Sequence, residues 1–109
     1  MTEPLCRLEC RREGPAQIVL LAGEIDLSNA PLVEADLRAI TEPALDTVVV
    51  LDDITYLDSA AIALLERLAR GQANVRVVLA RNAPTYRAVT IAGLQSLVPM
   101  YETIAEARS

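Results

Sequence analysis

Residues 47–68 read TVVVLDDITYLDSAAIALLERL and contain a strand pattern followed by a helix pattern. Residues 47–51 form a β-branched apolar run, which is typical of a strand covered on both faces. Two aspartates end that run, and a short link leads to the second pattern. Its apolar residues recur at helical spacing and are Ala61, Leu64, Leu65 and Leu68. We predict a helix that begins at Asp58 and Ser59 and that Gly71 closes as a C-cap.

The same alternation continues on both sides of this unit. Apolar runs at 18–22 and 75–80 predict two more buried strands, and alternation over 6–10 predicts a half-exposed strand. The other expected elements are a helix capped near Ser28 or Asn29 and stopped by Pro43, a helix from 82–84 to Gly93, an edge strand at 97–98 and a helix over 101–107. The order β-β-α-β-α-β-α-(β)-α predicts an α/β domain with a mixed, mostly parallel sheet and about four helices.

The composition excludes several classes of function. The 109 residues suffice for one domain, 1–109, and the 52 % of hydrophobic residues argue against disorder. The chain contains no histidine and no lysine, so it lacks the usual general base, the commonest metal ligand and a Schiff-base amine. A glycine-rich phosphate loop is also absent from the sequence. We therefore expect no enzymatic activity, no metal and no cofactor.

Charge is distributed unevenly along the chain. Residues 23–58 carry nine acidic side chains against Arg38, a net charge of −8, whereas residues 59–109 carry +3. The overall charge of −5 argues against binding to nucleic acid, which requires a basic surface. The central segment either faces a basic partner or forms a solvated acidic surface.

The sequence also bears on the compartment. No apolar run approaches the roughly 18 residues of a membrane span, and the first residues lack the apolar stretch of a signal peptide. Cys6 and Cys10 on one strand lie about 13 Å apart, too far for a disulfide. We expect two reduced thiols in a cytoplasmic protein that is not inserted in a membrane.

Two polar connections follow the predicted central strands, at 23–29 and 52–59. Because the carboxyl ends of parallel strands meet at one edge of a sheet, we expect Asp26, Asn29 and Ser59 to lie in one exposed patch. In such a patch, alanine in place of Asp26 should weaken partner binding and leave stability nearly unchanged.

The local sequence leaves two interpretations of Asp58 and Ser59 open. Both residue types satisfy the free amides of a helix start, so the pair is either an N-cap or a functional serine with its neighbour. The serine is not a hydrolase nucleophile of the usual kind, because there is no histidine to activate it and no G-x-S-x-G turn around it.

Four stretches in register resemble the STAS family, which includes bacterial anti-sigma factor antagonists. They are GEIDL at 23–27, VVVLD at 48–52, YLDSAAIALL at 56–65 and GLQSLVPMY at 93–101. The resemblance covers about residues 5–107 and implies a single STAS-like domain that binds a protein partner.

In the antagonist branch, the resemblance implies a partner that is both an anti-sigma factor and a serine kinase. The unmodified antagonist binds this partner and frees the sigma factor, and phosphorylation abolishes the binding. Ser59 matches the phosphorylated position, and Asp58 matches the aspartate before it. Asp26 and Asn29 match positions of the same partner-binding surface. The amino end of the helix is expected to hold the phosphate, so that its charge acts at the interface.

Ala60 and Ala61 depart from the family motif, which has a second hydroxyl residue and a glycine at these positions. Alanine favours the helix and stiffens its first turn. Two functions therefore stay open. Ser59 favours a switching antagonist, whereas the two alanines favour a non-switching STAS subunit of a lipid or anion transport complex or of a stress-signalling scaffold. The sequence does not determine the oligomeric state.

Overall fold

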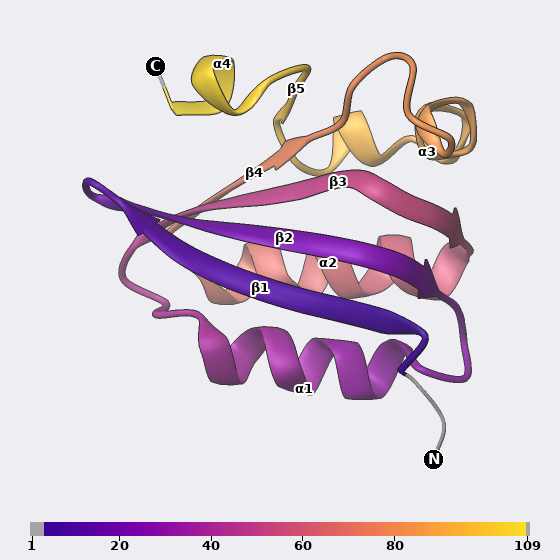
Figure 1. The fold of residues 1–109 in the computed structure, drawn as a ribbon, viewed down its shortest axis with the longest axis horizontal. Coiled ribbons are helices and arrows are strands. Elements are labelled where there is room, and N and C mark those ends of the chain that lie inside the picture. Colours follow the sequence, from indigo (N-terminus) through magenta and orange to yellow (C-terminus); the bar gives the residue numbers. More distant parts are fainter. Residues whose placement is uncertain (1–3, 109) are drawn as a thin grey trace.

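A five-stranded sheet with the order β1-β2-β3-β4-β5 organises the protein (Figure 1). The computed structural model describes residues 4–108. The strands are β1 (Cys6–Glu13), β2 (Ala16–Ile25), β3 (Asp46–Leu57), β4 (Asn74–Val78) and β5 (Met100–Tyr101). β1 runs antiparallel to β2, and every other neighbouring pair is parallel. This mixed, mostly parallel sheet confirms the predicted fold class.

Helices cover the sheet on both faces. Within residues 4–108 they are α1 (Ala30–Ile40), α2 (Ser59–Gly71), α3 (Tyr86–Ala92) and α4 (Ile104–Arg108), with a 3-10 turn at Leu94–Ser96. α1 and α2 lie side by side under one face, and α4 lies on the opposite side of the sheet (Figure 1). In this part of the chain, no helix has the length and apolarity needed to cross a bilayer.

Alternating side chains of the central strands fill two apolar layers. Val19 and Val49 are fully buried in the layer against α1 and α2, whereas Ile18 and Val48 are buried in the layer that includes Ala107 of α4. This arrangement confirms that the three apolar runs predicted as strands are adjacent and that both of their faces contribute to the core. The continuous apolar runs therefore reflect burial on two sides.

The two strands β2 and β3 are longer than their apolar runs indicate. β2 continues to Ile25 and β3 to Leu57. The connections predicted at 23–29 and 52–59 are therefore shorter in the structure, because each strand includes their first residues. The parallel pairing continues through two register shifts, and Ile54 is fully buried within the extension. Polar residues on the exposed side of a strand do not interrupt its backbone hydrogen bonds to the neighbouring strand. A prediction based only on apolar runs therefore ends such a strand too early.

The C-terminal elements begin later than predicted. α3 starts at Tyr86 rather than in residues 82–84, because a turn that contains a proline comes first. The expected edge strand at 97–98 is wrong: the strand is β5, at 100–101, and α4 follows it. Val98 is buried in the core, so its apolar character reflects packing rather than strand pairing.

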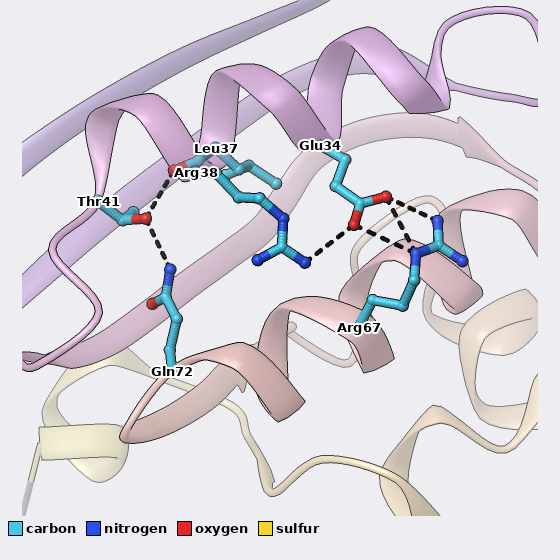
Figure 2. A network of polar contacts seen from close by, with 6 residues as sticks. All are labelled: Glu34, Leu37, Arg38, Thr41, Arg67 and Gln72. Carbon is cyan, nitrogen blue, oxygen red and sulfur yellow. Dashed lines mark hydrogen bonds and ion pairs between the residues drawn. The ribbon is translucent and has the colours of Figure 1, made fainter.

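Thr41 and Gln72 connect the C-terminal ends of α1 and α2, and α1 ends before Pro43, as predicted. Thr41 Oγ1 donates to the carbonyl of Leu37 at 2.6 Å and accepts from Gln72 Nε2 at 2.7 Å (Figure 2). Gly71 is the last residue of α2, and Gln72 follows it in an extended conformation. The predicted glycine C-cap is therefore wrong, because Gln72 leaves the helix to bond with Thr41.

One carboxylate joins α1 to α2. Glu34 accepts from Arg67, with 2.7 Å between Oε1 and Nη2, and from Arg38, with 3.1 Å between Oε2 and Nη2 (Figure 2). The hydrogen bond from Arg67 lowers the pKa of Glu34, and the same bond raises the pKa of Arg67. Exposed ion pairs stabilise a fold only slightly. This ion pair connects the two helices whose amino ends carry the candidate site.

The first strand alternates as predicted. Cys6 is buried and Cys10 is half-buried on the face toward the helices, whereas Arg7 and Arg11 are exposed on the other face. Both thiols are free, and burial raises the pKa of each.

Candidate functional site

The loop between β2 and α1 is held together by its own side chains. Asp26 Oδ1 accepts from the amide of Ser28 at 2.8 Å, from its hydroxyl at 2.5 Å and from the amide of Asn29 at 3.3 Å. Asn29 Oδ1 accepts from the Asp26 amide at 2.8 Å, and Asn29 Nδ2 donates to the Glu24 carbonyl at 2.8 Å. Asp, Asn and Ser form such local bonds readily. The loop is thus preformed, and the Asn29 amide group is engaged within it.

Asp58 connects this loop to α2. Its Oδ1 accepts from the Ala60 amide at 2.9 Å, and its Oδ2 accepts from the Leu27 amide at 3.1 Å. The backbone amide of Asp58 also donates to the Ile25 carbonyl at 3.3 Å. Asp58 is therefore the N-cap of α2, and it supports the neighbouring loop at the same time. Of the two interpretations left open by the sequence, capping applies to Asp58 and not to Ser59.

Ser59 is the exposed first residue of α2, and its hydroxyl has no hydrogen bond within residues 4–108. It borders a groove of about 380 Å³ between α2 and α3. The other residues that line this groove are Leu57, Asp58, Ile62, Ala63, Glu66, Ala88 and Ala92. The Ala60 amide already donates to Asp58. Fewer backbone amides at the start of α2 are therefore available to a phosphate than expected from the sequence. Two of the residues that line the groove, Asp58 and Glu66, are carboxylates.

The structure brings the four candidate residues to one end of the sheet. Asp26, Asn29 and the cap of α2 lie at the carboxyl ends of β2 and β3, where sites of open α/β sheets gather. Ser59 is exposed, whereas Asp26, Asn29 and Asp58 are half-buried. The bond between Leu27 and Asp58 shows directly that the two connections are in contact.

Three exposed apolar side chains were missed at the level of sequence. Leu27 is 78 % exposed, Tyr56 50 % and Ile91 75 %. Leu27 follows Asp26 in the loop, and Ile91 lies on α3, which also forms one wall of the groove. The sequence offered one signal for Leu27: it stands in a polar turn, outside any strand or helix pattern that would place it in the core.

Comparison with known proteins identifies the family. A family model of the STAS domain matches residues 7–107. The chain belongs to the STAS domain family. Its fold is similar to that of an anti-sigma factor antagonist from Mycobacterium paratuberculosis, with a TM-score of 0.83 and 23 % identity over 99 % of this chain and 96 % of that one.

Two further solved structures share the STAS fold. SpoIIAA in its unphosphorylated form has a TM-score of 0.66 and 13 % identity, over 94 % of this chain and 93 % of that one. A putative anti-sigma factor antagonist from Thermotoga maritima has a TM-score of 0.66 and 19 % identity, over 93 % and 91 %. No curated protein matches this sequence significantly. At these identities the likeness shows a common fold.

The geometry of Asp58 leads to a prediction about stability. Replacing Asp58 with alanine removes the cap of α2 and the acceptor of the Leu27 amide, and we expect a loss of about 2 kcal/mol in the free energy of unfolding. Asparagine keeps one amide oxygen and should lose roughly half as much. Urea denaturation measures both variants, with Ser59→Ala as the control that keeps the cap. Equal stability of Asp58→Ala and the parent protein would contradict this assignment.

Asp26 is expected to make the stability of the STAS domain depend on pH. The Ser28 hydroxyl, followed by the backbone amides of the loop, lowers the pKa of Asp26 below 3.8. A carboxyl with a lowered pKa stabilises the fold fully above its unfolded pKa, and this contribution disappears as the pH falls through the folded pKa. The melting temperatures of the parent and Asp26→Asn should differ by a constant amount above about pH 5 and converge below about pH 4.

Thermal melts between these pH values give the result, and Ser28→Ala should reduce the difference because it removes the strongest donor to Asp26. A difference that stays constant down to the acid limit would show that the Asp26 charge plays no part. These bonds also revise the expectation that alanine at Asp26 leaves stability nearly unchanged, since the carboxylate has three acceptor contacts inside its loop.

Proposed function

We propose that this STAS domain is an anti-sigma factor antagonist that binds an anti-sigma factor with serine kinase activity, and that phosphorylation of Ser59 weakens the complex. The observation that carries the proposal is the exposed, unbonded hydroxyl of Ser59 beside a groove with apolar walls. The anti-sigma factor antagonists among the similar structures support the general role. The partner-binding surface in this proposal comprises Asp26, Asn29, Asp58 and Ser59.

The apolar side chains supply the attraction in this proposal. Leu27 and Ile91 are largely exposed, and covering them removes apolar area from water. The polar loop around Asp26 is already ordered, so little conformational entropy is lost when a partner binds it. The domain contributes a surface and a phosphate acceptor, and the kinase performs the chemistry.

Phosphorylation changes the charge of this surface without requiring a change of fold. The kinase transfers the terminal phosphoryl group of ATP to Ser59 Oγ, which loses its proton, and ADP leaves. The phosphoserine adds about −1.5 to −2 charges beside Asp58 and Glu66. Two charges roughly 5 Å apart interact by about 3 kcal/mol at an effective dielectric constant near 20. Half of that repulsion against an acidic group of the partner weakens binding more than tenfold.

A second function rests on the first turn of α2. Ala61 is fully buried and Ala60 is half-buried, so this turn is packed against the core as well as capped by Asp58. A turn held in this way resists the local opening that a kinase active site requires. The alternative is a non-switching STAS subunit of a lipid or anion transport complex or of a stress-signalling scaffold, which uses the same surface constitutively.

Phosphorylation in vitro separates the two functions. A pull-down with the purified protein identifies its partner, and incubation with that partner and ATP is followed by intact-mass analysis. The first proposal expects one added phosphate that is absent from Ser59→Ala and still present in Ser96→Ala, an exposed serine outside the site. A stable complex without phosphate transfer supports the non-switching function. Binding that persists when Leu27 and Ile91 are both replaced by serine argues against this surface altogether.

A further inference from the structure

β1 forms an edge of the sheet, and no strand within residues 4–108 pairs with its outer side (Figure 1). In its pairing with β2, Leu5 lies opposite Glu24, and the Leu5 carbonyl accepts from the Glu24 amide at 2.8 Å. Because bonded and non-bonded pairs alternate in an antiparallel ladder, the odd-numbered residues of β1 bond to β2. The amides and carbonyls of Leu8, Cys10 and Arg12 are therefore directed toward the free edge.

The exposed face of this edge strand carries charges of alternating sign. Arg7, Glu9 and Arg11 are exposed, and Glu13 is half-buried. Arg7 and Glu9 have no ion pair within residues 4–108, whereas Glu13 pairs with Arg11 at 2.6 Å and with Arg108 at 2.8 Å. Charged residues on an edge normally prevent pairing with another strand, because most registers bring like charges together.

In one register of β1 against a second copy of itself, every charge on this exposed face lies opposite a charge of the other sign. When two antiparallel copies are centred on Cys10, Arg7 of each lies opposite Glu13 of the other. Glu9 of each likewise lies opposite Arg11 of the other. A shift of two residues in either direction places arginine opposite arginine and glutamate opposite glutamate. The register centred on Cys10 also makes the outward amides of residues 8, 10 and 12 face carbonyls of the other copy.

The opposite face of the same edge carries Cys6, Leu8 and Cys10, with the exposed Arg12 near its end. A groove of about 420 Å³ runs between β1 and α1, and its lining includes Cys6, Leu8, Ala39 and Ile40. Ile40 is 40 % exposed. A two-fold axis perpendicular to the sheet keeps the helices of both copies on one side, so the two grooves become neighbours.

We propose that two copies of this protein associate through their β1 edges, antiparallel and centred on Cys10, and form one continuous sheet. The self-complementary charge pattern selects a second copy of the chain as the occupant of this edge. The interface lies along β1, where Cys10 pairs with Val19 in the middle of β2. It is therefore separate from the proposed partner surface around Ser59, and neither proposal depends on the other.

Charge reversal tests the proposed register. Glu9→Arg and Arg11→Glu each place like charges opposite each other twice, and each should raise the dimer dissociation constant at least tenfold in sedimentation equilibrium. An equimolar mixture of the two variants should dimerise again, because each reversed charge then faces the other. Arg87→Glu, on the exposed surface of α3, makes the same change in net charge as Arg11→Glu and should leave dimerisation unaltered. Circular dichroism confirms that each variant is folded.

A cross-linking measurement tests the same register without changing a charge. In a hydrogen-bonded antiparallel pair the Cα atoms are about 5.5 Å apart, within the range of Cα separations that disulfides span. Diamide should join the Cys10 thiols of Cys6→Ser protein into a covalent dimer: each thiol loses a proton and an electron, and diamide is reduced to the hydrazine. Cys10→Ser should give none. A parent protein that is monomeric at about 1 mM, or a dimer unaffected by both charge reversals, would overturn the proposal.

Discussion

Replacing Ser59 with aspartate is expected to weaken binding of the proposed anti-sigma factor partner at least tenfold and to leave the fold intact. The new carboxylate lies at the exposed first position of α2, beside Asp58 and the groove that the partner is proposed to cover. Its charge must lose water on binding and repels acidic groups of the partner, and half of a 3 kcal/mol repulsion corresponds to roughly a tenfold loss. Isothermal titration calorimetry measures the affinity.

Alanine at the same position is the matched control. The Ser59 hydroxyl has no hydrogen bond within the described part of the chain, and Asp58 supplies the cap. Ser59→Ala should therefore keep the affinity and change the free energy of unfolding by less than about 0.5 kcal/mol. Equal affinities of the alanine and aspartate variants would place Ser59 outside the interface. A strongly destabilised alanine variant would instead restore the capping role that the sequence left open for this serine.

Replacing Gly23 with alanine is expected to cause the largest loss of stability among single methyl additions. Gly23 has φ +113°, a conformation that L side chains rarely adopt, and a Cβ there would lie 2.1 Å from the Leu5 carbonyl oxygen. That oxygen accepts the Glu24 amide, so the methyl group also disrupts the start of the β1–β2 ladder. Backbone strain and overpacking together should cost about 3 kcal/mol or more.

Gly93 provides the control for this prediction. Its φ is +84°, but a Cβ there has no neighbour within 4 Å among the described residues. Gly93→Ala should therefore show the backbone term alone, about 1 kcal/mol. Urea denaturation of both variants separates steric overlap from conformational preference. Similar losses in the two variants would show that the close approach of Leu5 to Gly23 is relieved at little cost.

The order of the elements follows from local patterns. The apolar runs at 18–22, 47–51 and 75–80 are adjacent strands, and the helical period after Asp58 is α2, as predicted. Such patterns suffice because burial on two faces requires continuous apolar residues, and burial on one helix face requires a 3.6-residue period. Prediction was less accurate where polar residues continue a strand, as in β3 beyond Asp52, because pairing with β2 is not a local property.

The common location of the four candidate residues was predicted, but their hydrogen bonds were not. Asp26, Asn29, Asp58 and Ser59 lie at one end of the sheet, as the order of parallel strands implies. Asp58 caps the helix, whereas the Ser59 hydroxyl has no hydrogen bond within residues 4–108. This distinction depends on which side chain accepts from the Ala60 amide. The exposed Leu27 was missed because neighbouring sequence does not reveal what covers a loop.

By itself, the sequence determined the fold class, the order of strands and helices and the two connections that carry polar groups, since each depends on the spacing of residues along the chain. Only the tertiary structure decided that Asp58 bonds across to the Leu27 amide, that the backbone of Gly23 meets Leu5 and that the β1 edge is free. Each of these depends on segments that are distant in the chain and adjacent in space. The physical reason is that hydrogen bonds and steric contacts act between neighbours in space, whereas periodicity reports the environment of one segment at a time.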